Sequence, residues 1–440
     1  MGNRLWKKAF DNPLARDVFT TTAWSVLGKG IGFTIPFFIA AWFGITNQTD
    51  IFFFAYGIIL FIVTIIIPIG ENIIVPYIAE ARSSDRDVGS FIGGVLAAAT
   101  VGLIILIGIF LLAMKPLLSI VTRFDKQSLK TVYMLLLEIT PLIVLSVWSS
   151  VLVGSMNAYK KFNLPAISPA FRAIVNLIFI YIFKGFWGIH AIAWGYVAGE
   201  AVRVSILLWT IYKLRLFSIS FHARLSGNVR EFFKTASFQV IGLIAFGFNP
   251  IVDQAMASWL GTGNISVLYY ADRIYAIPLT IGISGLSVVL LSEWSKKYYT
   301  NKDTEALFRD SLRTIKIIAL IAILATVLFC LFSGWMIRVV YGAGSISADM
   351  LTNIRSCFIF FVLGLTPYLV ATVVINVHQV LKHTKVVMQW AFFSVAANIL
   401  LNLVLMKYMG VAGLAFSTTF VCAIGTVYLL RRLYKDTVKN

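Results

Sequence analysis

Long apolar stretches, separated by short polar segments, recur along the whole chain of 440 residues. A stretch of about 20 apolar residues is long enough for a helix to cross a hydrocarbon core of about 30 Å. The pattern predicts twelve membrane-spanning helices, at residues 20–44, 51–79, 90–114, 131–157, 164–183, 187–212, 232–260, 268–292, 312–333, 352–377, 386–406 and 410–431. We therefore expect an all-α polytopic membrane protein.

The predicted spans form two related halves. Three identical pairs lie at a constant offset of 217 positions (259 minus 42): Trp42 and Trp259, Gly44 and Gly261, and Asn47 and Asn264. Later matches are Thr140-Pro141 with Thr366-Pro367, and Gly188 with Gly410. Six spans in each half give both halves the same orientation. Parallel repeats of this kind are typical of transporters whose substrate path runs between the halves.

The repeat sets the expected domain boundaries. They are a cytoplasmic amphipathic N-terminal segment at 1–19, an N-lobe at 20–215, a cytoplasmic linker at 216–231, a C-lobe at 232–431 and a cytoplasmic tail at 432–440. The first lobe would contain helices 1–6 and the second lobe helices 7–12.

Composition and charge support a membrane protein. Hydrophobic residues make up 59% of the chain and charged residues 13%, whereas soluble proteins carry roughly 25% charged residues. The net charge of +18 comes from Lys and Arg residues that gather in alternate loops. Such loops are cytoplasmic in membrane proteins, so both termini are expected in the cytoplasm. Without a soluble domain, we expect no nucleic-acid partner. The cysteines Cys330, Cys357 and Cys422 are widely spaced in apolar runs, so no disulfide or metal motif is expected.

The first span contains a cation among helix-weakening residues. Lys29 lies between Gly28 and Gly30, with Gly32 and Pro36 following. The seventh span has a corresponding break at Asn249-Pro250. Interrupted helices at matching places in two halves indicate a transport site and its hinges. The alternative is a simple kink that serves packing.

Other charged residues within the spans suggest contacts with cargo. Arg273 follows Asp272 at the head of the eighth span, and Arg172 lies in the fifth. The planar fork of an arginine can bind two phosphate oxygens at once. We expect Lys29, Arg172 and Arg273 to give a cavity a positive wall. Glu200 and Arg203 are three residues apart, so they are expected to pair with each other.

Four oxygen-bearing side chains form a candidate ion site. They are Asp253, Asn398, Asn402 and Thr418. Hard cations prefer such ligands, so this set predicts either a Na⁺ site or a proton relay through Asp253. A network of hydrogen bonds between helices is the alternative.

Two short segments resemble a known family. Thr49-Asp50-Ile51-Phe52-Phe53 after the first span and Tyr269-Tyr270-Ala271-Asp272-Arg273 in the eighth resemble the MurJ (MviN) family of lipid II flippases. That family belongs to the multidrug/oligosaccharidyl-lipid/polysaccharide exporter superfamily. The resemblance implies two six-helix lobes around a cationic cavity, with alternating access.

The resemblance also implies roles for single residues. By position, Asp50, Asp272 and Arg273 match functional residues of the family and are expected to contact the cargo, and Lys29 replaces a cavity arginine. The set of Asp253, Asn398, Asn402 and Thr418 falls where the family has a Na⁺ site, with Asn402 in place of an expected carboxylate.

Three features depart from the family pattern. Ile35 replaces a second cavity arginine, and Phe61–Ile69 lacks the usual arginines of the second span. The twelve predicted spans are two fewer than the fourteen typical of the family. These departures leave open two cargoes, lipid II and an exopolysaccharide repeat unit.

We therefore expect a flippase, not an enzyme. It would move an undecaprenyl-pyrophosphate-linked saccharide from the inner to the outer leaflet of a bacterial cytoplasmic membrane. We expect a monomer that contacts membrane lipids and biosynthetic enzymes, with no cofactor beyond Na⁺ or H⁺ as coupling ion. The alternative is a small-molecule or multidrug exporter of the same superfamily, coupled to Na⁺ or H⁺, whose cavity should be acidic. A membrane enzyme acting on the same lipid would need a larger outer loop than this chain has.

Overall fold

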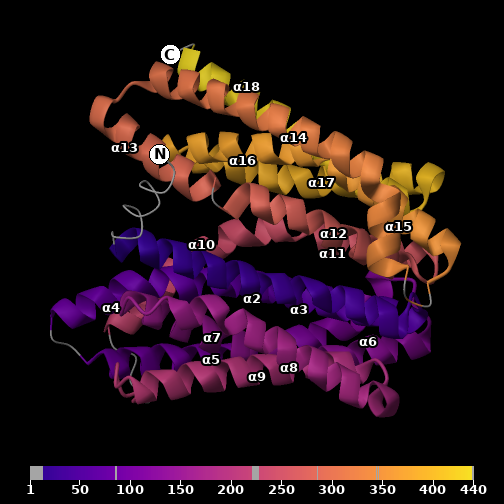
Figure 1. Ribbon diagram of the computed structural model, residues 1–440, viewed down its shortest axis with the longest axis horizontal. Helices are drawn as coiled ribbons and strands as arrows, with labels where there is room; N and C mark the ends of the chain where they lie inside the picture. Colours follow the sequence, from indigo (N-terminus) through magenta and orange to yellow (C-terminus); the bar gives the residue numbers. More distant parts are fainter. Residues whose placement is uncertain are drawn as a thin grey trace, which may run out of the picture. The chain divides into compact units, whose positions relative to one another are not determined.

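The computed structural model describes residues 13–84, 87–220, 227–284, 286–342, 344 and 346–438. All regular secondary structure in these ranges is helical (Figure 1). The elements are α2 (Pro13–Phe43), α3 (Asn47–Pro68), the π-helix η1 (Ile69–Ile73), α4 (Ile74–Ser83), α5 (Val88–Val121), α6 (Lys126–Ile139), α7 (Pro141–Ala158), α8 (Asn163–Trp187), α9 (His190–Lys213), α10 (Gly227–Gly247), α11 (Asn249–Ala257), the 3-10 turn η2 (Ser258–Leu260), α12 (Asn264–Ser284), α13 (Leu286–Asn301), α14 (Thr304–Tyr341), α15 (Ala348–Leu363), α16 (Leu365–Val380), α17 (Thr384–Met409) and α18 (Val411–Val438). The predicted all-α fold is confirmed.

Ten helical segments in the described ranges are long and apolar enough to cross a membrane. They correspond to ten of the predicted spans. The other two, 232–260 and 268–292, are covered by α10 to η2 and by α12 with α13. Most of the predicted N-terminal segment 1–19 lies outside the described residues, and its last seven residues (13 to 19) begin α2.

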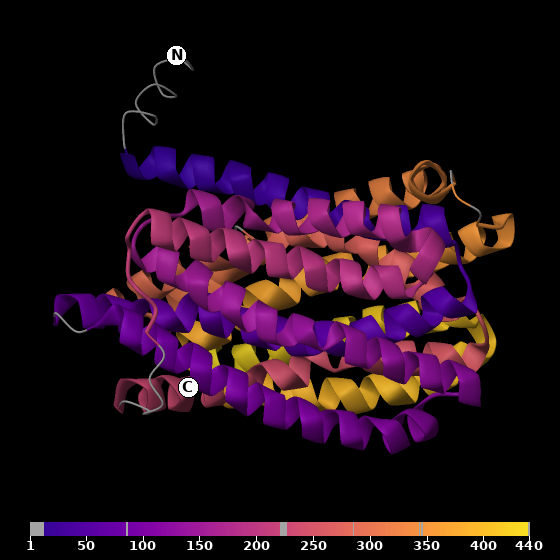
Figure 2. The same ribbon diagram turned by 90° about the horizontal axis from the view of Figure 1, so that it is seen from below.

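The chain folds into two compact units. One unit contains the described residues up to Ile39 and Phe54–Ile244, and the other contains Ala40–Phe53 and the chain from Ala245 onward. Within the first unit α8 lies beside α9, and within the second α17 lies beside α18. Figure 2 shows the helices of the first unit, in purple and magenta, running side by side. Residues 40–53, predicted in the N-lobe, belong to the second unit, and residues 232–244, predicted in the C-lobe, belong to the first unit.

Residues at the start of α10 pack into the apolar core of the first unit. Val229 and Phe232 are 1% and 3% exposed and pack with Ile78 and Phe91 in one apolar cluster. The hydroxyl groups of Tyr77 and Thr235 also form a hydrogen bond of 2.9 Å. These contacts fix the start of α10 against α4 and α5.

The backbone repeats between the two halves. Gly44 and Gly261 adopt φ angles of 64° and 97°, a region that disfavours residues with a Cβ. Each glycine ends a helical segment, and the next helix begins at Asn47 or Asn264. Gly188 and Gly410 likewise have φ angles of 52° and 57° before α9 and α18. The sequence repeat therefore corresponds to a structural repeat.

The two predicted interruptions differ in the structure. α2 runs as one helix through Gly28, Gly30, Gly32 and Pro36. In contrast, α10 ends at Gly247 and α11 begins at Asn249, with Pro250 in its first turn. The helix break in the second half is present, whereas a hinge in α2 stays a prediction that rests on its glycine content.

Candidate functional site

Asp50 holds the first turn of α12. It is 2% exposed, and its carboxylate accepts hydrogen bonds from the backbone N–H of Gly263 and from Ser266. The Ser266 backbone N–H is 2.8 Å and its hydroxyl 2.6 Å from Oδ1 of Asp50. A carboxylate at a helix N-terminus satisfies backbone donors that lack helical partners. This contact occupies both oxygens of Asp50, and its predicted contact with cargo stays a prediction.

The loop before Asp50 is itself ordered by a reciprocal cap. The Thr46 hydroxyl accepts from the Thr49 N–H at 3.2 Å, and the Thr49 hydroxyl accepts from the Thr46 N–H at 2.9 Å. Such paired side-chain contacts satisfy two orphan donors at the start of a helix. The threonines thereby place Asp50 at a fixed position on α3.

Arg273 is held by an ion pair and by aromatic rings. Its guanidinium lies 3.2 Å from the Asp272 carboxylate, so these neighbours pair although consecutive residues on a helix point about 100° apart. The same guanidinium lies 4.6 Å from the centroid of Tyr269. Tyr269 in turn stacks on Phe53, with centroids 4.0 Å apart. The side chains of Arg273 and Asp272 remain 27% and 41% exposed, so both are accessible to a ligand.

A charged cluster lies in the first unit. Glu200 of α9 pairs with Arg203 at 3.2 Å, which confirms the predicted pair, and with Arg172 of α8 at 3.3 Å. The Ser149 hydroxyl also donates to Glu200. Arg172 was predicted as a cavity cation; the structure shows it partly neutralised, with its side chain 31% exposed.

Lys29 belongs to the same electrostatic environment. It is exposed on α2, and its charge interacts with Glu71, as do the charges of Arg172 and Arg203. Glu71 lies in the π-helix η1, an element that often marks a functional site. Glu71 is not among the site residues that were predicted from the sequence. The sequence does contain a sign of this role, because Glu71 is an acidic residue within an apolar span and directly follows Pro68, Ile69 and Gly70.

The predicted oxygen cluster is brought together in the second unit. Asp253 is 5% exposed and accepts from the Asn402 amide at 2.7 Å and from the Thr418 hydroxyl at 2.9 Å. The Asn402 amide also donates to Oδ1 of Asn398 at 3.2 Å. Oδ1 of Asn402 is buried without a hydrogen-bond partner. This orphan acceptor, with neighbouring carboxylate, amide and hydroxyl oxygens, fits a monovalent hard cation.

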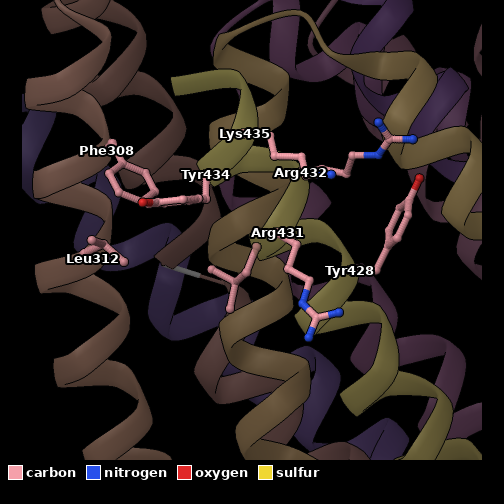
Figure 3. A pocket seen from close by; sticks show the side chains of 8 residues that line it. Phe308, Leu312, Tyr428, Arg431, Arg432, Tyr434 and Lys435 are labelled. Atoms are coloured by element: carbon pink, nitrogen blue, oxygen red, sulfur yellow. The ribbon is translucent and has the colours of Figure 1, made fainter. Parts of the chain in front are cut away.

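A basic hollow in the second unit was not predicted. It lies between α14 and α18 and has a volume of about 660 Å³ (Figure 3). Phe308 and Leu312 of α14 line it on one side, and α18 contributes the cations Arg431, Arg432 and Lys435 together with Tyr428, Leu430 and Tyr434. The guanidinium of Arg432 lies 5.7 Å from the Tyr428 ring centroid. Basic hollows between membrane helices suit anionic lipid headgroups.

Comparison with known structures identifies the fold. The chain superposes on the lipid II flippase MurJ in an inward closed conformation with a TM-score of 0.77 and 21% identity, covering 96% of this chain and 89% of that one. It also superposes on an inward-facing multidrug resistance transporter of the MATE family, in the MOP superfamily. That match has a TM-score of 0.79 and 12% identity, covering 94% of this chain and 95% of the other. These neighbours confirm the transporter fold predicted from the repeat.

Sequence comparison identifies the family. A probable lipid II flippase MurJ from Buchnera aphidicola subsp. Acyrthosiphon pisum is 24% identical over 440 residues, 97% of this chain and 84% of the relative. Another from Rickettsia prowazekii is 27% identical over 377 residues, 84% of this chain and 73% of the relative. The family model described as lipid II flippase MurJ matches residues 39–440. Because this match covers nearly the whole chain, the protein belongs to the MurJ family of lipid II flippases.

Proposed function

We propose that this protein moves lipid II, an undecaprenyl-pyrophosphate-linked saccharide, from the inner to the outer leaflet of a bacterial cytoplasmic membrane. The observation that carries the proposal is the family match across residues 39–440. The multi-pass helical fold fits this role, because a lipid carrier must work within the bilayer. The gathering of Lys and Arg in alternate loops supports an orientation with both termini in the cytoplasm. We further propose that the protein acts as a monomer and meets the enzymes that make its cargo.

Two cations are the strongest candidates to bind the pyrophosphate. Lys29 is exposed on α2 and interacts with the charge of Glu71. Arg273 is partly exposed and is oriented by Tyr269 and Asp272. A pre-oriented guanidinium can bind two phosphate oxygens with little loss of side-chain freedom. Arg172 is a weaker candidate because Glu200 already pairs with it.

The proposal is tested by reconstituting the full chain in vesicles and measuring lipid II exposure on the opposite leaflet. Lys29→Ala and Arg273→Ala should each lower the rate at least tenfold, and Lys29→Arg should restore it. Lys184→Ala is the matched control. It removes a membrane-helix cation that lies 4.9 Å from the ring centroid of Tyr181, outside the proposed site. Normal transport by both alanine variants would exclude the pyrophosphate contact.

The coupling ion is a separate part of the proposal. We propose that Na⁺ binds the oxygens of Asp253, Asn398, Asn402 and Thr418. The support is the buried acceptor Oδ1 of Asn402, which has no hydrogen-bond partner. The Asn402 amide donates to both Asp253 and Asn398, and the Thr418 hydroxyl donates to Asp253, so the other oxygens lie close by. Transport should then depend on Na⁺ at fixed membrane potential, and Thr418→Val should weaken that dependence. If transport follows the proton gradient and ignores Na⁺, Asp253 is a proton carrier instead.

A further inference from the structure

An apolar groove lies within the first unit, between η1, α5, α7 and α10. Its volume is about 750 Å³, and we call it the α5 groove. Small residues create the hollow, among them Gly70 of η1, Ala98, Ala99 and Gly102 of α5, and Ser150 of α7. Phe232 and Phe233 of α10 close one side.

The helix that lines this groove faces lipid. Leu106 lines the groove and is 62% exposed, and its neighbours Val101 and Ile105 are 60% and 58% exposed. A Cβ built on Gly102 would meet no atom within 4 Å, so the space beside it is open. An apolar cavity is not hydrated. Within a bilayer such a groove is filled by a hydrocarbon chain.

Arg230 gives the groove one polar end. Of the lining residues in the described chain, Arg230 is the one that carries a charge, and its side chain is exposed. It lies in the first turn of α10. The ends of α4 and α7 also meet in this unit, where Arg82 donates to the Ala158 carbonyl at 3.1 Å. Lys and Arg are abundant in these connecting segments, which is typical of the cytoplasmic headgroup layer.

We propose that the α5 groove binds one acyl chain of an anionic phospholipid from the cytoplasmic leaflet, with its phosphate on Arg230. The apolar walls accept the chain, and the guanidinium matches a phosphate with two hydrogen bonds. A single cation balances a monophosphate better than a pyrophosphate. Neither Lys29 nor Arg273 lines the groove, and the proposal stands whether or not the chain carries lipid II.

The lipid would contact an element of functional interest. Gly70 lines the groove, and the next residue, Glu71, interacts with the charges of Lys29 and Arg203. A bound chain therefore packs against the π-helix that carries Glu71. Its occupancy should influence how that helix can rearrange.

The test measures lipid bound to the purified, delipidated full chain by native mass spectrometry. Palmitoyl-oleoyl phosphatidylglycerol is compared with phosphatidylcholine that has the same chains. The wild type should bind one phosphatidylglycerol at the groove about tenfold more tightly than phosphatidylcholine. Both headgroups contain a phosphate, but the choline cation of phosphatidylcholine offsets its charge and repels the Arg230 guanidinium. The basic hollow with Arg431 and Arg432 can bind a further lipid, so filling the α5 groove is expected to remove one lipid per chain and to leave that further lipid bound.

Two variants and two controls assign that lipid. Gly102→Phe fills the groove and should remove one lipid of either type. Arg230→Ala should abolish the tenfold preference, mainly by weakening the binding of phosphatidylglycerol. Gly108→Phe lies on the same helix, also in open space but outside the groove. Lys234→Ala removes an exposed cation one turn along α10. Both controls should bind lipid as the wild type does.

Several results would overturn the proposal. Equal affinity for the two phospholipids in the wild type would exclude the selection of an anionic headgroup by Arg230. An equal loss in Gly108→Phe and Gly102→Phe would exclude the groove. Displacement of phosphatidylglycerol by undecaprenyl pyrophosphate at the same concentration would assign the groove to the tail of the cargo. If Gly102→Phe does not fold, the surface variant Arg230→Ala decides, and an unchanged preference in it refutes the site.

Discussion

The contact between Asp50 and the start of α12 makes a quantitative prediction. The carboxylate accepts three hydrogen bonds, two from backbone N–H groups of Gly263 and Ser266 and one from the Ser266 hydroxyl. Hydrogen bonds to charged groups contribute about 1.5–3 kcal/mol each, and a buried donor left unpaired costs about 1–3 kcal/mol. These values are not additive, because one side chain supplies all the acceptors. Asp50→Ala should therefore lower the free energy of unfolding by about 3–5 kcal/mol.

A double-mutant cycle isolates the interaction. Ser266→Ala removes one of the three donors and should cost about 1–2 kcal/mol. In the double variant this cost should largely disappear, giving a coupling energy of about 1 kcal/mol or more. The measurement is equilibrium unfolding of the purified chain in mixed detergent micelles, followed by tryptophan fluorescence. Amide hydrogen exchange at Gly263 and Ser266 should also accelerate in Asp50→Ala.

Asp349→Ala is the matched control for this cycle. Asp349 is also an acid in the first turn of a helix, α15, but its side chain is exposed. Its replacement should change stability by about 0.5 kcal/mol or less. If Asp50→Ala costs no more than Asp349→Ala, or if the two effects at Asp50 and Ser266 simply add, the proposed cap does not stabilise the fold.

Three further predictions test other features. Gly70→Ala places a Cβ against the Ser150 hydroxyl and should destabilise the protein by about 1–3 kcal/mol. Gly30→Ala lies in open space and should be neutral or stabilising, and thermal unfolding in detergent compares the two variants. Glu200→Ala leaves two arginine partners without their carboxylate and should cost about 3–5 kcal/mol, measured by the same unfolding assay. Hydrogen bonds from the first turn of α6 lower the pKa of the exposed Asp125 carboxyl. The hydrogen bond by which Asp125 caps α6 should therefore be complete above the ordinary pKa of about 3.9. It should be lost as pH falls through the lowered pKa. The amide chemical shifts of that turn should follow this titration, and a midpoint above the ordinary value would contradict the cap.

Patterns of local sequence predicted much of the architecture. Apolar length and the spacing of Trp42, Gly44 and Asn47 indicated a duplicated helical membrane protein, and the structure repeats the same glycine conformation at Gly44 and Gly261. The oxygen cluster around Asp253 was also predictable. These features follow from the bilayer as solvent, because polar groups in a spanning helix need partners nearby.

Tertiary structure alone decided which partner each polar group has. The contact of Asp50 with cargo stays a prediction, and the partner that the structure shows for it is the Gly263 N–H, 213 positions away. Arg172 was assigned to a cavity wall and pairs with Glu200. The groove that joins Gly102 to Arg230 comes from helices distant in the chain. Such contacts depend on how particular side chains pack across helices, and helix periodicity or hydropathy carries no record of that packing.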